Sequence, residues 1–315
     1  MDGALHRGDG PKVSVVIPTS GRPELVLEAA RSVLGQRVSE LEVLVVLDGR
    51  DDRTAVALSK IGDPRLRIIT LDPARGGNAA RNAGVRAATA QLVALLDDDD
   101  TWGSQHLDVL LRDAEPADRP WCRFARFEAV TAMGTEVWPR RLKPADEAVA
   151  DYLFDRRRLF HGEALLHPST MLCPRQLLLD HPFDERLRRH QDWDWLIRTE
   201  RAAGMSVTVL PDVIARVRVQ DGRARPYFPV DEQLDWIESV RPLISRRAYS
   251  GYLLTQIGVR SAGSRDHRLG WWALRTSVRR GRPRLRHVAV FAFLWLVPPG
   301  VRRRFRTIVL GRRRR

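Results

Sequence analysis

The sequence predicts an α/β fold with a mostly parallel wound sheet, because apolar runs alternate with amphipathic or alanine-rich ones from residue 13 to residue 102. Four runs are typical of strands, at residues 13–19, 41–47, 66–71 and 92–96. Their apolar residues hardly alternate with polar ones, which indicates strands buried on both faces of a parallel sheet. We therefore expect right-handed crossovers, with ligands bound beyond the carboxyl ends of the strands.

Three helices connect these strands. The first begins at Pro23, which suits the first position of a helix, and ends near Gln36. The second covers residues 52–60, and the third covers residues 78–88 with Asn78 as a suitable N-cap. The apolar stripe of the first helix consists of Leu25, Ala29, Val33 and Leu34.

The second half of the chain is less regular. Residues 121–130 predict a strand on which Glu128 is exposed, and residues 146–160 predict a helix. Residues 207–210 and 213–219 predict a last pair of strands.

Another helix begins within residues 189–198, with acidic residues in its first turns. Capping by Asp192 or Asp194 is the ordinary interpretation of these acids, because carboxylates stabilise helix N-termini. Packing is likewise the ordinary role for Trp193 and Trp195, and a stacking platform for a ligand is the alternative.

Two histidines, His161 and His167, lie in a polar loop before this helix. No third zinc ligand lies near them in the sequence, so a zinc site is not expected. The loop is instead predicted to line the space for a substrate.

The net charge of +14 belongs to the C-terminal end of the chain. Residues 265–315 contain sixteen arginines and one aspartate, a charge of +15, so the preceding 264 residues carry −1. No nucleic-acid-binding motif accompanies the charge, and nucleic acid is not an expected partner.

Cys122 and Cys173 lack metal-ligand spacing. We expect both to be buried free thiols, as in a protein of a reducing compartment such as the cytoplasm. Residues 1–12 lack the apolar core of a secretory signal.

Polar residues follow each predicted strand at the same edge of the sheet. Thr19 follows the first strand, Asp48 the second, residues 76–81 the third, and four consecutive aspartates at 97–100 the fourth. Adjacent carboxylates repel one another unless a cation lies among them, and oxygen ligands suit Mg²⁺ or Mn²⁺. A solvated acidic turn, or a helix N-terminus near Asp100, is the alternative. Glycine-rich dinucleotide and P-loop motifs are absent.

With these motifs in this order, the chain resembles the inverting nucleotide-sugar glycosyltransferases of family 2, which have the GT-A fold. The likeness covers about residues 13–220. Asp97 and Asp99 match the two acids of the family's DxD pattern, and Asp100 matches an extra acid that many members have. The matching segments are VVIPT at 15–19 with Arg22, Asp48-Gly49, GGNAARNAG at 76–84, LDDDDTW at 96–102 and QDWDW at 191–195.

The resemblance implies a role for each matching residue, with Asp192 as the general base and a divalent metal, Mg²⁺ or Mn²⁺, bridging the donor's diphosphate. It places Thr19 and Asp48 at the nucleoside and Arg81 at the ribose-diphosphate region. The implied donor-binding residues are Pro18, Thr19, Arg22, Asp48, Arg81, Asp97 and Asp98, and the implied metal ligands are Asp99 and Asp100. On the acceptor side we expect His167, Ser169 and Trp193.

Two departures from the family pattern keep alternatives open. Gln191 stands where the family usually has Glu, so a catalytically inactive sugar-nucleotide-binding scaffold is one alternative. A nucleotidyltransferase is another, although only residues 20–22 stand where such enzymes carry a glycine-rich signature with a lysine. Residues 215–218 read ARVR where many members read Tyr-Arg-x-His, and Arg218 would reach a phosphate oxygen directly.

The C-terminal tail is arginine-rich around the apolar residues 288–297, which are too few to span a bilayer because a span needs roughly 20. Such a segment suits an anionic membrane surface, and a helix packed on the core with a solvated basic end is the alternative. We therefore expect a cytoplasmic enzyme, peripheral on the inner face of the cytoplasmic membrane, that glycosylates a hydroxyl of a saccharide or lipid-linked saccharide in cell-envelope synthesis. The expected divisions are an N-terminal tail at 1–12, a GT-A domain at 13–225 with a nucleotide-binding half at 13–102 and an acceptor half at 103–225, and a helical extension at 226–315.

Overall fold

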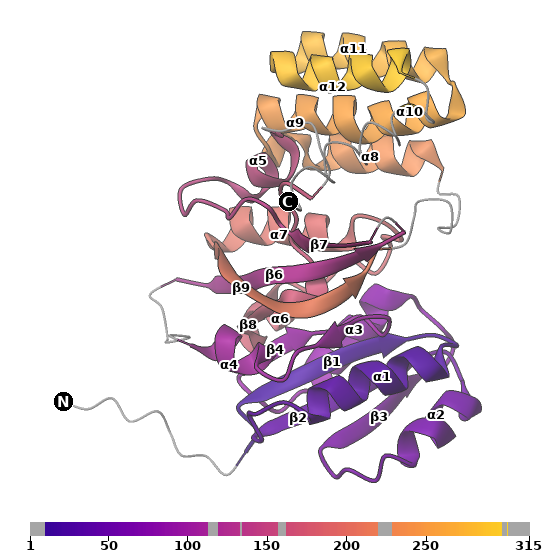
Figure 1. Ribbon diagram of the computed structural model, residues 1–315, viewed down its shortest axis with the longest axis vertical. Coiled ribbons are helices and arrows are strands. Elements are labelled where there is room, and N and C mark those ends of the chain that lie inside the picture. The colour runs from indigo at the N-terminus through magenta and orange to yellow at the C-terminus, as the bar shows by residue number, and fades with distance from the viewer. Residues whose placement is uncertain are drawn as a thin grey trace, which may run out of the picture.

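The computed structural model describes residues 10–112, 119–132, 134–156, 162–219, 229–297 and 301. Within these residues a nine-stranded mixed sheet has the order β3-β2-β1-β4-β8-β6-β9-β5, and β7 pairs with β6 off this path. The C-terminal helices stack beyond one end of the sheet, on the side of α5 and α7 (Figure 1).

The four predicted strands form the parallel part of the sheet, each within one residue of its predicted bounds. They are β1 (Val13–Thr19), β2 (Leu41–Asp48), β3 (Leu66–Leu71) and β4 (Leu92–Leu95). β1 pairs in parallel with β2 and β4, and β2 pairs in parallel with β3. Every residue of β1 is buried, as its unbroken apolar run predicts.

Helices cover both faces of this parallel part. Val15 and Val43 pack with the buried residues of α1 and α2, whereas Val16 and Leu44 pack with α3 on the opposite face. The two faces differ because successive side chains of a strand point to opposite sides of the sheet. The helices are α1 (Pro23–Leu34), α2 (Asp52–Ser59) and α3 (Gly77–Ala87).

Two details of these helices correct the sequence predictions. Leu25 and Leu34 are only partly buried, and the buried stripe of α1 consists of Pro23, Val26, Ala29, Ala30 and Val33. Asn78 is not an N-cap, because Gly76 takes that position and the Asn78 amide donates to the carbonyl oxygen of Asp184 at 2.7 Å. Within α3, a Cβ on Gly84 would lie 2.3 Å from a methyl group of Val16, so glycine permits close packing against β1.

The second half of the chain completes the sheet with β5 (Thr101–Trp102), β6 (Trp121–Thr131), β7 (Gly134–Trp138), β8 (Leu172–Pro174) and β9 (Ser206–Arg218). β8 is antiparallel to β4 and β6, whereas β9 is parallel to β6 and antiparallel to β5. Glu128 is exposed on β6, and Cys122 and Cys173 are buried and free, as predicted.

The predicted pair of strands at 207–210 and 213–219 is wrong, since both segments belong to the single strand β9. Its register against β6 shifts between Leu210 and Val213. Pro211 lies in this shift, and such an irregularity is a usual place for proline in a strand because proline has no N–H to donate.

Short helices connect these strands. They are α4 (His106–Leu111), α5 (Val149–Phe154), the 3₁₀ turn η1 (Pro168–Thr170), α6 (Arg175–Asp180) and α7 (Gln191–Ala203). The helix predicted at 146–160 is shorter in the structure, because only α5 forms in its described part, and residues 157–161, with His161, lie outside the described residues.

The C-terminal helices share their core with the rest of the protein. Trp236 and Tyr252 from these helices belong to the same apolar cluster as Phe124, Phe154 and Trp195. The elements are α8 (Val230–Val240), η2 (Arg241–Leu243), α9 (Arg246–Tyr252), the π-helical η3 (Leu253–Ile257), α10 (Gly258–Ser264), α11 (His267–Arg280) and α12 (Leu285–Leu296).

The apolar segment predicted at 288–297 forms most of α12, and it is partly packed on the protein. Val290 and Phe291 are buried, whereas Leu285 and Leu296 are 89% and 80% exposed. Among the described residues, no helix combines the length and the apolar character that crossing a bilayer requires. The terminal residues 302–315 lie outside the described part.

Candidate functional site

A polar cavity of about 340 Å³ lies at the carboxyl ends of the parallel strands. It brings together ten of the thirteen site residues that the sequence predicts, and it leaves out Ser169, Asp192 and Trp193. Ser20, Gly77 and the side chain of Gln191 also line the cavity, although the sequence motifs did not assign them to the donor site. Ser20 and Gln191 are next in the chain to the predicted residues Thr19 and Asp192. The lining residues are Pro18, Thr19, Ser20, Arg22, Asp48, Gly77, Arg81, Asp97, Asp98, Asp99, Asp100, His167, Gln191 and Arg218.

Asp48, at the end of β2, fixes the glycine loop that leads into α3. Its Oδ1 accepts hydrogen bonds from the backbone N–H of Arg75 at 2.6 Å and of Gly76 at 3.0 Å. Gly76 has φ 95°, a conformation that favours glycine. The carboxylate therefore shapes the entrance to α3 while it also lines the cavity.

Arg81 joins the acidic segment to the start of α7. Its guanidinium donates to Asp97 Oδ1 at 2.7 Å, to Gln191 Oε1 at 3.0 Å and to Asn78 Oδ1 at 3.2 Å. Nε of Arg81 is buried without a hydrogen-bond partner among the described residues. Burial acts to raise the pKa of Asp97, but the Arg81 charge and hydrogen bond help to hold that pKa below its usual value. Gln191 thus serves as a neutral acceptor for an arginine that already has a carboxylate partner.

Asp98 is turned toward the loop after β1. It is 1% exposed, and Oδ2 accepts a hydrogen bond from the Thr19 hydroxyl at 2.5 Å. The Arg22 guanidinium lies 2.5 Å from its Oδ1. Burial raises the pKa of Asp98 to about 6, against the effect of these partners. Asp98 therefore ties the acidic segment to the first strand.

Asp100 accepts hydrogen bonds from Ser169 and from the backbone of β9. Its Oδ2 accepts from the Ser169 hydroxyl at 2.5 Å, and Oδ1 accepts from the backbone N–H of Arg218 at 2.9 Å. Burial raises the pKa of Asp100 to about 6. The Ser169 hydroxyl also accepts from the backbone N–H of Asp97 at 3.1 Å, so this residue lies buried under the acids rather than on the cavity wall.

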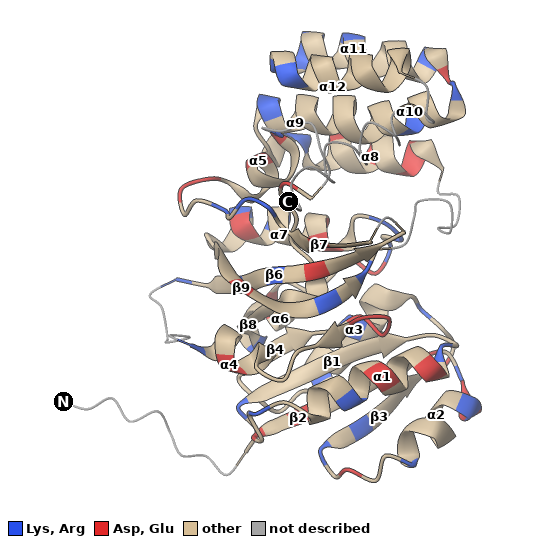
Figure 2. Ribbon diagram, viewed as in Figure 1, with Lys and Arg blue, Asp and Glu red and all other residues tan. Residues whose placement is uncertain are grey.

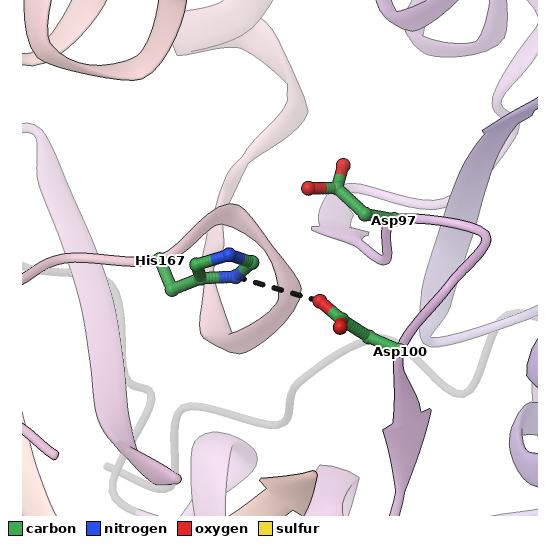
Figure 3. A group of neighbouring side chains, drawn as sticks. All are labelled: Asp97, Asp100 and His167. Carbon is green, nitrogen blue, oxygen red and sulfur yellow. Dashed lines mark ion pairs between the residues drawn. The ribbon is translucent and has the colours of Figure 1, made fainter. Parts of the chain in front are cut away.

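Asp97, Asp100 and His167 form a group with metal-ligand geometry among the described residues. Each offers one ligand atom, and the three atoms lie within 4.8 Å of one another. Figure 3 shows the His167 ring directed at Asp100, with Nδ1 3.6 Å from Oδ2, and Asp97 beside them. Asp99, which the sequence motif assigns to the metal, is not in this group and lies 3.4 Å from the Arg22 guanidinium.

This grouping was missed in the sequence because the partners of His167 lie far away in the chain. No third zinc ligand lies near His161 and His167 in the sequence, and the acids that meet His167 come from the loop after β4. One signal in the sequence pointed to such a group. Arg218 stands where many family members have a histidine, so a histidine from another segment, such as His167, could take that place.

Asp192 lies in the first turn of α7 and directly follows Gln191, which lines the cavity, but Asp192 is not itself a lining residue. It is half-buried, and burial raises its pKa, although the charges of His167 and Arg81 oppose that rise. The capping interpretation does not hold, because His190 precedes the helix in the left-handed region, with φ 57°, and no side chain caps it. Asp194 instead accepts from Arg198 and from the indole of Trp236, both at 2.9 Å.

Trp193 has the packing role that the sequence favoured. Its ring stacks on His190 with centroids 4.7 Å apart and meets the edge of Phe154 at 5.2 Å. Trp195 is buried and donates its indole N–H to the carbonyl oxygen of His181 at 2.6 Å. Both tryptophans fix α7 rather than line the cavity.

Comparison with known proteins agrees with this geometry. The model of the family described as glycosyl transferase family 2 matches residues 14–180. The amylovoran biosynthesis glycosyltransferase AmsB of Erwinia amylovora is 26% identical over 256 residues, which cover 76% of this chain and 82% of that protein. The succinoglycan biosynthesis protein ExoO of Rhizobium meliloti (strain 1021) is 28% identical over 267 residues, which cover 82% of this chain and 75% of that protein.

A solved structure shows the same fold. The S. aureus TarS fragment 1-349 in complex with UDP-GlcNAc has a TM-score of 0.57 and 16% identity, and the likeness covers 90% of each chain. The expected GT-A fold, a curled and largely parallel sheet with a helical C-terminal part, is therefore confirmed.

Proposed function

This chain belongs to glycosyl transferase family 2 and is a glycosyltransferase, and we propose that it moves a sugar from a nucleoside-diphosphate donor to a hydroxyl acceptor with inversion at the anomeric carbon. The observation that carries the proposal is the convergence of Asp97, Asp100 and His167 with Arg81 in one cavity, and Asp192 directly follows a residue of its wall. Family membership argues against the nucleotidyltransferase alternative.

The donor half of the proposal rests on the cavity's shape and charge. Its volume of about 340 Å³ lies in the range of small-ligand sites. The unpartnered Nε of Arg81 and the half-exposed guanidinium groups of Arg22 and Arg218 suit the oxygens of a diphosphate. TarS, which shares the fold, was crystallised in complex with UDP-GlcNAc. That complex supports a nucleotide sugar as the donor.

A divalent metal fits the residues that are present. Two carboxylates and one imidazole within 4.8 Å of one another are a donor set that suits Mn²⁺ and, through the oxygens, Mg²⁺. We assign the metal to Asp97, Asp100 and His167, with Asp99 as the further candidate from the sequence motif. When bound, the ion would offset the negative charge that develops on the leaving diphosphate.

The protein's own groups account for the remaining chemistry. Asp192 takes the proton of the acceptor hydroxyl, and its raised pKa makes it a stronger base than an exposed aspartate. The hydroxyl oxygen attacks the anomeric carbon from the side opposite the diphosphate, which inverts the configuration. Arg81 holds Gln191 and so restrains the turn that carries Asp192. Arg81 and Arg218 stabilise the leaving group through charge.

We further propose that the acceptor is a saccharide or lipid-linked saccharide of the cell envelope. AmsB is named for amylovoran biosynthesis and ExoO for succinoglycan biosynthesis, and their matches cover most of this chain. We propose that the enzyme works in the cytoplasm, peripheral on the inner face of the membrane, because such polymers are synthesised from nucleotide sugars.

The test is turnover with a panel of nucleotide sugars and saccharide acceptors in Mg²⁺ or Mn²⁺. We expect one donor to release nucleoside diphosphate only with metal, and nuclear magnetic resonance of the product to show an inverted anomeric centre. Metal-dependent nucleotide binding without turnover for any donor and acceptor pair would instead indicate an inactive binding scaffold. A retained configuration would refute the inverting mechanism.

A further inference from the structure

Helix α11 presents two tryptophans to solvent. Trp271 is 66% exposed and Trp272 is 36% exposed. Arg268, Arg275 and Arg279 are exposed on the same helix, three to eight positions away from Trp271. Because residues three or four apart are neighbours on a helix surface, these five side chains form one stripe. We call this stripe the α11 face.

An apolar groove between α11 and α12 adjoins the α11 face. It has a volume of about 240 Å³, and Trp271 borders both the groove and the face. Gly270 allows the two helices to lie close, because a Cβ there would be 2.4 Å from the ring of Trp295. The groove is lined by His267, Gly270, Trp271, Leu274, Phe291 and Trp295.

The charge of this surface is basic and largely unneutralised. Among the described residues, no acidic side chain pairs with Arg268, Arg275 or Arg279, whereas the neighbouring Arg280 lies 3.8 Å from Glu238. The single acid of residues 265–315, Asp266, caps α11 by accepting from the backbone N–H of Leu269 at 3.0 Å. Figure 2 shows basic residues on α11.

We propose that the α11 face docks on an anionic phospholipid bilayer. Tryptophan rings favour the headgroup level of a membrane, and arginines beside them can bind lipid phosphates while their stems cover apolar surface. Leu285 and Leu296 on the neighbouring helix α12 are 89% and 80% exposed, which adds exposed apolar side chains to this end of the molecule. A nucleic-acid partner would use the arginines and aromatic rings but would gain nothing from these leucines. The inference rests on the proposed function only in that a lipid-linked acceptor would lie at this surface.

Binding of the full chain to vesicles tests the α11 face. The probes are vesicles of phosphatidylglycerol with phosphatidylethanolamine, and vesicles of phosphatidylcholine alone. We expect binding to the anionic vesicles that weakens as salt is raised, and little binding to the neutral ones. The triple variant Arg268→Gln, Arg275→Gln, Arg279→Gln should weaken anionic binding by roughly 100-fold, since each charge contributes about 1 kcal/mol. Trp271→Ala should weaken it by a factor that salt does not change.

A matched triple variant, Arg31→Gln, Lys60→Gln, Arg86→Gln, removes the same charge from exposed positions on other elements. It should leave binding within about threefold of wild type, because distant exposed charges are screened. Point variants are preferred to truncation, because Arg284 and His287 at the start of α12 contact the buried Asp155.

Several results would overturn the inference. The wild-type chain could fail to bind anionic vesicles at low salt, both triple variants could lose the same amount of vesicle binding, or the triple variant of the α11 face could lose none; each of these results would refute docking through the α11 face. Loss of single-stranded RNA binding instead of vesicle binding would assign the face to nucleic acid, and loss of a dimer in sedimentation would assign it to a second copy. Calorimetry of UDP and of GDP, each with Mn²⁺, on each variant separates this inference from the proposed function, because nucleotide binding should be unchanged in every variant.

Discussion

The phenolic oxygen of Tyr252 lies 2.8 Å from Nε2 of His190, which joins the C-terminal helices to the residue just before the segment that carries Asp192. His190 holds a left-handed conformation with φ 57°, which is uncommon outside glycine and needs support from its surroundings. That support comes from Tyr252 and from the rings of Trp193 and Trp236, with centroids 4.7 and 4.4 Å from the His190 ring. The C-terminal helices thus hold the turn at the start of α7, the helix that carries the proposed base Asp192.

The Tyr252→Phe variant should lower kcat several-fold with little change in the donor KM. It removes the hydrogen bond but keeps the ring, so the turn before Asp192 loses orientation while the nucleotide site is unaffected. Tyr249→Phe is the matched control, because Tyr249 donates to Glu238 away from α7. Both variants should lose about 1 kcal/mol of unfolding free energy in urea. Equal kcat values for the two variants would mean that the Tyr252 hydrogen bond is only structural.

The Asp192→Asn variant should retain donor binding and lose transfer by roughly 10²–10⁴-fold, the usual contribution of a general base. Isothermal calorimetry measures the first quantity and single-turnover transfer the second. Asp194→Asn serves as the comparison, because Asp194 is bonded to Arg198 and Trp236 and should affect stability more than transfer. Near-normal transfer by the Asp192 variant would remove the assigned base.

The pH dependence of kcat/KM should show the ionisation of Asp192. The residue acts as a base only when it is deprotonated, and burial raises its pKa above the ordinary value of 3.8. Activity should therefore be present above the raised pKa and fall as the pH is lowered through it. A rate that stays level down to the ordinary aspartate pKa would show that no buried carboxylate limits the reaction.

Two substitutions distinguish the two candidate sets of metal ligands. The structure groups Asp97 and Asp100 with His167, whereas the sequence motif indicates Asp99 and Asp100. His167→Gln should weaken the Mn²⁺-dependent tightening of nucleoside-diphosphate binding at least about 10-fold, because it removes a ligand atom from the group with Asp97 and Asp100. Asp99→Asn should have a smaller effect, since Asp99 lies outside that group. The reverse order in calorimetry would show that the metal is bound as the motif predicts, by Asp99 and Asp100.

Asp155 at the end of α5 should contribute pH-dependent stability. Burial acts to raise its pKa, but contacts from His287 and Arg284 outweigh burial and lower the pKa from 3.8 to about 2. A lowered pKa means that the contribution is present above about pH 4 and is lost as the pH falls toward 2. Asp155→Asn should thus cost on the order of 2 kcal/mol at neutral pH in urea unfolding.

The control for this prediction is Asp52→Asn, which breaks an exposed pair with Arg50. It should change stability by no more than about 0.5 kcal/mol. If the Asp155 and Asp52 variants were equally stable at neutral pH, the contacts between Asp155 and α12 would not anchor the C-terminal helices.

The sequence by itself determined the parallel part of the sheet and the edge on which the site lies. Runs such as residues 13–19 and 41–47 are apolar at nearly every position, and only a strand covered on both faces buries all of them. Because the carboxyl ends of parallel strands meet at one edge, the order of Thr19, Asp48 and the four aspartates already placed these residues together. The apolar pattern of each strand and the polar residues that follow it were enough to predict this part of the sheet and the edge that carries the site.

The tertiary structure alone decided which groups face one another within that edge. Asp98 is turned to Thr19, whereas Asp97 and Asp100 lie beside His167, although all three acids belong to one run. The left-handed turn at His190 likewise depends on Tyr252, which is distant in the chain. Such contacts follow from how strands and helices from separate segments pack, and neither helical period nor strand alternation carries that information. For this reason the sequence located the site, and the packing of distant segments determined its geometry.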